Sequence, residues 1–185
     1  MGVRRRHIRA VAEKLLQEHC PNGAPVNVRE IAEALGVEVK LDRVDDDLSG
    51  FLYREPSTGR AVIGANANHH PNRRNFTVAH ELGHYLLHEA ETVHLDSKSS
   101  GYTLQLRSPE SATGENINER EANLFAAELL MPMKFLEEDL KKSDLDLLED
   151  KGAAKKLQSL AKKYGVSVQA LTIRLANLGY INHES

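Results

Sequence analysis

Two histidines and a glutamate stand at the spacing of a metal-binding helix. They are His80, Glu81 and His84, in the pattern HExxH. Residues four apart lie one turn from each other on the same helical face, so both imidazoles can reach one tetrahedral zinc ion. Glu81 then lies beside the metal, where it can take a proton from water whose pKa the zinc has lowered. The pattern predicts one zinc ion per chain, with Glu81 as the catalytic base of a hydrolase.

The residues around the motif predict the helix that it needs. Apolar side chains recur at helical spacing and Pro71 suits a first turn, so we expect a helix over residues 71–88. Its apolar flank consists of Phe76, Ala79, Gly83, Leu86 and Leu87. The alternative interpretation is a solvated helix with two incidental histidines, and the apolar flank argues against it.

A catalytic zinc ion needs a third protein ligand. His88 stands one turn beyond His84, but it lies about 12 Å along the axis from His80, so we do not expect one ion to bind all three. We expect His88 to support a ligand or to lie at the surface. The extended pattern HExxHxxGxxH also fails, because Ala90 occupies the position of its third histidine.

A second helix, expected over about residues 118–130, carries the best candidate for the third ligand. Its apolar face consists of Ala122, Phe125, Ala126, Leu129 and Leu130. At about 100° per residue, Glu119 falls at the edge of this face and Glu121 well outside it. We therefore expect Glu119 to bind the metal and Glu121 to face water; the alternative for Glu119 is an ordinary boundary residue. Asn123, four residues after Glu119, can hydrogen-bond a ligand histidine.

The rest of the chain predicts a small sheet among helices. The turn 55–59 joins two strands into a hairpin, and the polar segment 89–118 has little regular structure beyond a possible hairpin of 93–95 with 102–106. A connection this long is more often functional than idle, so we expect a wall or lid over the site. Helices are expected over 4–19, 28–35, 132–142, 153–164 and 168–178, and strands over 37–41, 49–53 and 60–65.

Composition and charge narrow the class of protein. The 185 residues are 41% hydrophobic and 28% charged, with a net charge of -3, which gives no global attraction to nucleic acid or anionic lipid. No run approaches the roughly 20 apolar residues of a membrane span, and the N-terminus lacks a signal-peptide core. The single cysteine, Cys20, fits a reducing compartment. We expect a cytoplasmic protein with no membrane partner.

The two helical motifs resemble those of the ImmA/IrrE-type metallopeptidases. The matching residues are 76–84 and 119–132, and weaker likenesses upstream extend the resemblance over most of residues 8–180. It implies zinc held by His80, His84 and Glu119, with Glu81 as general base, and a protein substrate, commonly a helix-turn-helix repressor. It implies an α+β fold: a mainly helical, zincin-like metallopeptidase domain with a sheet of about three strands. We expect a single domain over residues 1–185, with a core over 8–140 and a helical part over 151–180.

A second pattern suggests a different function. Residues 160–171 fit a helix-turn-helix, with Ala161 at the helix crossing, Gly165 in the turn and Leu171 packing back. Residues 151–183 hold six Lys or Arg and no acidic residue, yet they offer few base readers beyond Gln169, Thr172 and Arg174. DNA contact through 151–178 is therefore not the expected role. The alternative function is a DNA-binding or partner-binding regulator that keeps the peptidase fold with little or no proteolysis.

Two features of catalysis stay open at this point. The strand over 60–65 precedes the metal helix and is either an edge strand that pairs with an extended substrate or a plain structural strand. The group that stabilises the oxyanion is one of four candidates: Tyr53, Tyr85, Tyr102 and His88.

Overall fold

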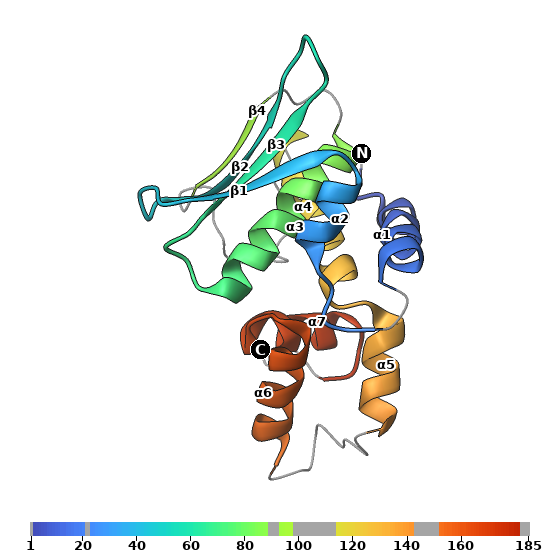
Figure 1. Cartoon of the computed structure of the whole chain (residues 1–185). Helices are drawn as coiled ribbons and strands as arrows, with labels where there is room; N and C mark the ends of the chain where they lie inside the picture. Colours follow the sequence, from blue (N-terminus) through green and yellow to red (C-terminus); the bar gives the residue numbers. More distant parts are fainter. Residues whose placement is uncertain (1, 21–22, 89–92, 98–113, 143–151, 182–185) are drawn as a thin grey trace.

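The computed structural model describes residues 2–20, 23–88, 93–97, 114–142 and 152–181. Within them the chain forms mainly helices and one small mixed sheet, which confirms the expected α+β class (Figure 1). The elements are α1 (Arg5–His19), α2 (Val28–Ala34), β1 (Val37–Asp42), β2 (Leu48–Arg54), β3 (Ala61–Asn66), α3 (Pro71–Leu87), β4 (Val93–Ser97), α4 (Gly114–Leu130), α5 (Met133–Lys142), α6 (Ala153–Tyr164) and α7 (Val168–Asn177). The sheet has four strands rather than about three, because β4, where 93–95 was expected as part of a separate hairpin, pairs with β2. Most of the expected lid lies outside the described residues.

The strand order is β1-β3-β2-β4. The predicted hairpin is present, with Leu52 of β2 opposite Ile63 of β3, and both side chains are buried on the helix-covered face. However, β3 is not an edge strand, because β1 pairs with it in parallel on its other side. Within the described residues, the edges of the sheet are β1 and β4. An extended peptide therefore cannot add to the sheet at residues 60–65.

Two glycines let the central helix α3 pack closely on both sides. A Cβ on Gly50 of β2 would lie 2.3 Å from Thr77 Cγ2 and 2.7 Å from the carbonyl oxygen of Gly64. A Cβ on Gly83 would lie 3.1 Å from the Cα of Ala122 on α4. Since real Cβ contacts are almost never this short, the two glycines fix the spacing of sheet, α3 and α4.

The remaining helices lie beside and below the paired helices α3 and α4 (Figure 1). In Figure 1, α1 lies at one side of the paired helices, and α5, α6 and α7 lie below the sheet. Ile8, Ala12 and Leu15 of α1 are buried in the hydrophobic core that α4 also enters through Phe125 and Leu129. Helix α4 thus packs against α1 as well as α3. In the described part of the chain, no helix is long and apolar enough to cross a membrane.

Candidate metal centre

The HExxH residues lie in the middle of α3, between the sheet and α4. The helix starts as predicted, with Pro71 in its first turn and His70 Nδ1 accepting a hydrogen bond from the Asn72 backbone N–H. His80, Glu81 and His84 are all buried. Polar side chains are costly to bury unless they have hydrogen-bond or ionic partners, so these three buried side chains require partners from neighbouring elements.

The partners come from α4 and from the sheet. Glu119 of α4 lies with Oε1 3.1 Å from His84 Nε2 and with Oε2 3.4 Å from His80 Nε2. His94 of β4 brings its Nε2 to 3.3 Å from Glu119 Oε1 and stacks its ring on His84 at 3.7 Å between centroids. The two α3 histidines hold their Nε2 atoms 3.2 Å apart. One ligand atom from each of the four residues lies within 4.8 Å of the others.

These distances fit a tetrahedral metal ion. A zinc ion with ligand bonds of about 2.0–2.1 Å separates neighbouring ligand atoms by roughly 3.3 Å, the edge of the tetrahedron. Four of the separations, at 3.1–3.4 Å, match that edge, and all four ligand atoms lie within 4.8 Å of one another. Three imidazole nitrogens and one carboxylate are also donors that zinc accepts. The donor set of this chain therefore fits the ion that the sequence predicts.

Neighbouring groups orient this donor set. His80 Nδ1 lies 3.0 Å from Asn123 Oδ1, as expected for a histidine that donates from Nδ1 and presents its Nε2 lone pair to a metal. Burial alone would raise the pKa of Glu119, but the hydrogen bonds and charges of His80 and His84 hold that pKa well below its usual value. Glu119 is therefore a carboxylate, the form that binds metals.

The expectation that Glu121 faces water is wrong. Its side chain is buried and lies between Arg4, at 2.5 Å, and His88 Nε2, at 3.3 Å. Burial raises the pKa of Glu121, but hydrogen bonds from Arg4 and His88 and the Arg4 charge lower it to about 2. His88 is buried as well, with Nδ1 3.2 Å from His84 Nδ1, so it supports a ligand histidine and does not lie at the surface.

Sequence reasoning also missed His94. It lies in a polar segment with no helical spacing to the HExxH pair, and only the alternation of Val93, His94 and Leu95 in a strand could have indicated that one side chain points inward. Among the four oxyanion candidates, Tyr53 is exposed on the outer sheet face and Tyr85 lies beneath the Arg54 guanidinium, 4.4 Å from it. Tyr102 lies outside the described residues.

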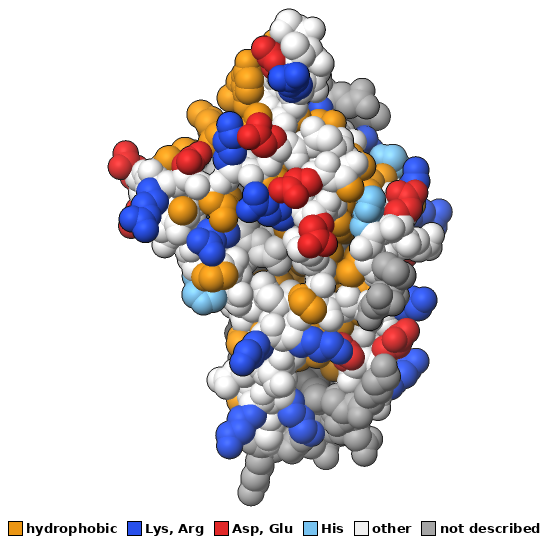
Figure 2. All heavy atoms as spheres, viewed as in Figure 1, with side chains coloured by type: hydrophobic (Ala, Val, Ile, Leu, Met, Phe, Trp, Pro, Cys, Tyr) orange, Lys and Arg blue, Asp and Glu red, His pale blue; other side chains and the backbone are white. Residues whose placement is uncertain are grey.

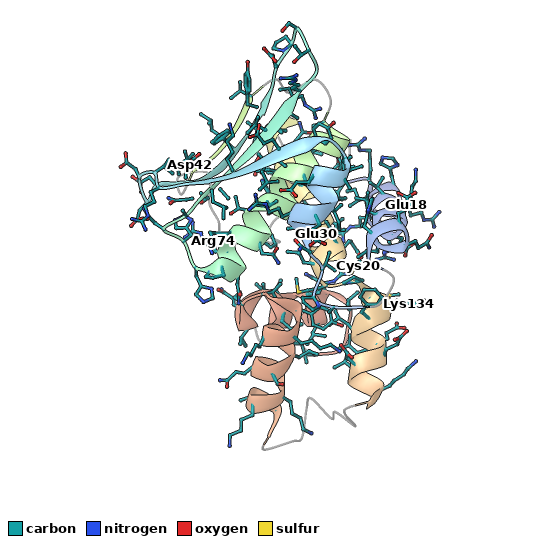
Figure 3. All side chains as sticks on the ribbon, viewed as in Figure 1. Glu18, Cys20, Glu30, Asp42, Arg74 and Lys134 are labelled. Carbon is teal, nitrogen blue, oxygen red and sulfur yellow. The ribbon has the colours of Figure 1, made fainter. Side chains whose placement is uncertain are left out.

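Cys20, the single cysteine, is not placed for nucleophilic catalysis. Its thiol donates to the carbonyl oxygen of Gly23, and burial together with the Glu30 charge raises its pKa. Figure 3 labels Cys20 and Lys134, which both line a groove between α1 and the start of α5. None of the four clustered residues lines that groove.

A comparison of this sequence with models of protein families identifies the family of the chain. A peptidase family model described as the IrrE N-terminal-like domain matches residues 32–176. The chain belongs to this family. A solved structure of a Mycobacterium tuberculosis transcriptional regulator has the same fold, with a TM-score of 0.60 and 17% sequence identity. The likeness covers 92% of this chain but 47% of that one, so the chain spans about half the length of that regulator. No curated protein matches the sequence.

The match to the IrrE N-terminal-like domain extends into α7, so the C-terminal helices belong to the matched region. They pair as the sequence predicts, with Gly165 in the left-handed conformation between α6 and α7. Lys and Arg side chains lie over the lower part of the face in Figure 2, where Figure 1 places α6. Yet Arg174, one of three expected base readers, is buried against Glu128, which argues against DNA reading by α7.

Proposed function

We propose that this protein is a zinc-dependent endopeptidase with one zinc ion per chain. The observation that carries the proposal is the convergence of four donor atoms on the helix that also carries Glu81. His80, His84 and Glu119 would hold the ion through two nitrogens and one carboxylate. When bound there, zinc acts as a Lewis acid that polarises the peptide carbonyl and lowers the pKa of water.

Glu81 moves the proton in this reaction. It follows His80 directly on α3, is buried, and its Cγ lies 3.8 Å from the Cβ position of Gly50 on β2. Its carboxylate accepts a proton from the attacking water and then delivers it to the leaving amide nitrogen. The Glu81 side chain thus lies between α3 and the sheet, beside Gly50.

His94 is a fourth donor, and a catalytic zinc site keeps one position open. The other three donors stand on the two helices that pack most closely, whereas His94 stands on an edge strand and is partly exposed. His94 would supply a further donor beside His80, His84 and Glu119 when an ion is bound.

The substrate peptide adds to the sheet at β4. Among the described residues this strand pairs on one side only, and its Val93 and Leu95 side chains are 55% and 59% exposed on either side of His94. An extended peptide that pairs with the other side of β4 would run past the candidate metal centre, in the manner of β-augmentation. This places the pairing that the sequence suggested for residues 60–65 on a different strand.

The substrate class is a cytoplasmic regulator, a helix-turn-helix repressor. Two observations support it: the resemblance to ImmA/IrrE-type peptidases, and the fold shared with a protein named as a transcriptional regulator. The exposed lysines of α6 supply a basic surface for an acidic partner, and binding to a partner restricts cleavage to that protein.

The test compares wild-type protein with Glu81→Gln, which has nearly the same size but cannot act as a base. Both are loaded with zinc and incubated with the repressor encoded beside this gene, and with casein as a general substrate. We expect one zinc per chain in both, a single cut in the repressor by the wild type, and none by Glu81→Gln. Cleavage by Glu81→Gln, or casein digestion as fast as repressor cleavage, contradicts the proposal. An uncut repressor with DNA bound to the wild type favours the regulator alternative.

A further inference from the structure

We propose that a pocket between α1, α4 and α7 binds a small organic phosphate, a phosphomonoester whose organic part is short and apolar. None of the four clustered donor residues lines this pocket. The proposal therefore goes beyond the peptidase function and does not depend on it. It rests on the positive charge at the rim of the pocket, on the pairing of those charges and on the apolar floor.

The residues that line the pocket carry an excess of positive charge. Four arginines and a single carboxylate, that of Glu128, line it, although the whole chain has a net charge of -3. Arg5 and Arg9 stand one turn apart on the same face of α1. Arg120 comes from α4 and Arg174 from α7. This arrangement favours an anionic ligand.

Three of the four arginines are available to such a ligand. Arg174 is not, because it is buried and donates to both carboxylate oxygens of Glu128, at 3.1 and 2.6 Å. Arg9 makes only long contacts with the same carboxylate, 3.4 and 3.3 Å to Oε1, and its side chain is 47% exposed. Within the described ranges, neither Arg5 nor Arg120 forms an ion pair. These three guanidinium groups can therefore turn to a ligand without leaving Glu128 unpaired.

Three guanidinium groups suit a phosphate group better than a carboxylate. A phosphomonoester carries a charge of about -1.5 to -2 at neutral pH and has three acceptor oxygens. A carboxylate carries one charge on two oxygens. Arginine pairs with phosphate oxygens through two parallel charge-assisted hydrogen bonds. A phosphate group can thus engage all three arginines, whereas a carboxylate leaves more of their charge unpaired.

The floor of the pocket selects the other end of the ligand. It is apolar and comes from three helices: Phe76 of α3, Leu124 and Met131 of α4, and Ile173 and Leu178 at α7. The pocket has a volume of about 80 Å³. One water needs only about 10–15 Å³, and an apolar cavity that takes benzene has about 150 Å³. The buried part of the ligand is therefore on the order of three to four carbon atoms.

The first experiment is calorimetric titration of the full-length protein with butyl phosphate, in phosphate-free buffer of about 0.1 M ionic strength. We expect one site per chain and a dissociation constant below about 1 mM. Butanol lacks the anion and inorganic phosphate lacks the apolar chain, so each should bind at least about 10-fold more weakly. Pentanoate, with one charge and two oxygens, should also bind more weakly than butyl phosphate.

The second experiment repeats the titration with variants of the pocket. Arg5→Gln and Arg120→Gln should each weaken butyl phosphate binding about 10-fold, because each removes a charge-assisted contact. The matched control is Arg6→Gln, at an exposed arginine beside Arg5 that does not line the pocket, and it should leave the affinity unchanged. Ala127→Leu fills the apolar part and should remove the preference for butyl phosphate over inorganic phosphate. Asn123 also lines the pocket but contacts His80, so it is left unchanged.

Several results would overturn the inference. They are no binding of butyl phosphate at about 5 mM, equal losses in Arg5→Gln and Arg6→Gln, or inorganic phosphate or pentanoate binding as tightly as butyl phosphate. Binding that leaves the methyl NMR signal of Ile173 unshifted would place the ligand elsewhere and would overturn it too. A phosphopeptide that binds more tightly than butyl phosphate, with the same dependence on Arg5, would identify a protein ligand and not a small molecule. If Ala127→Leu does not fold, the variants at the exposed arginines decide.

Discussion

A buried ion pair joins the C-terminal helices to the helix that carries Glu119. Arg174 of α7 donates to both carboxylate oxygens of Glu128 on α4, at 3.1 and 2.6 Å, and its Nε donates to the carbonyl oxygen of Met131. Both side chains are about 5% exposed. We predict that Arg174→Met destabilises the protein by about 3 kcal/mol, because it leaves the Glu128 charge buried.

The magnitude follows from what remains beside Glu128. Removing one partner of a buried pair costs about 3–5 kcal/mol. Arg9 stays 3.3 Å from Glu128 Oε1, but its side chain is 47% exposed and its bonds are long, so it offsets only part of the loss. We therefore expect the lower end of this range. The double variant Arg174→Met, Glu128→Met removes both charges and should lie within about 1 kcal/mol of wild type.

Urea unfolding of the zinc-free protein measures these free energies. The matched control is Lys163→Met, which breaks an ion pair with Asp139 that is equally short, 2.6 Å, but far more exposed at Lys163. An exposed pair is worth at most about 1 kcal/mol. If Arg174→Met costs no more than Lys163→Met, burial does not govern this contact and the reasoning is wrong. A single unfolding transition in all variants would also support the expected single domain over residues 1–185.

Three further predictions concern α3, β4 and α6. Gly83→Val should destabilise the protein by about 1–3 kcal/mol and weaken zinc binding, because its Cβ alone would lie 3.1 Å from the Ala122 Cα; unchanged unfolding in urea would contradict the close packing of α3 and α4. His94→Ala should lower zinc affinity less than His84→Ala does and should retain peptide cleavage; loss of cleavage with zinc still bound would show instead that His94 acts on the reacting groups. Burial, followed by the hydrogen bond to Asp139, raises the pKa of Tyr164 far above 10, so the unfolded chain loses this proton first and stability should fall as pH rises above about 10. Tyr164→Phe should show a smaller fall in thermal unfolding between pH 9 and about 11, and an equal fall would rule out this assignment.

The parts of the site that the sequence predicts are those set by local geometry. His80, Glu81 and His84 stand within two turns of one helix, and helical spacing alone places them on one side. Helical spacing also predicts Glu119, because this residue borders the apolar stripe by which α4 packs on α3. The structure brings all the predicted donors together, and the fold class follows from the same helical and alternating patterns.

The sheet was predicted less well because strand order is not a local property. The hairpin of β2 and β3 is marked by its turn, but nothing within residues 37–66 shows that β1 pairs in parallel with β3. That pairing makes β3 central, while the antiparallel pairing of β4 with β2 brings His94 beside His80, His84 and Glu119. Residues 93–95 were expected as one strand of a possible hairpin, but so short a pattern does not show that this strand pairs with β2.

The prediction for Glu121 failed because it considered α4 against one neighbouring helix only. Residues two apart on a helix point about 200° from each other, so Glu119 and Glu121 cannot both face α3 directly. A helix with one apolar face would therefore leave Glu121 in water, but α4 has a second neighbour in α1, whose preceding Arg4 lies 117 residues away in sequence. His88, one turn beyond His84, lies between Glu121 and His84 and contacts both side chains. The two carboxylates thus lie on opposite sides of α4: Glu119 is next to both His80 and His84, whereas Glu121 reaches His84 only through His88, the residue that follows α3.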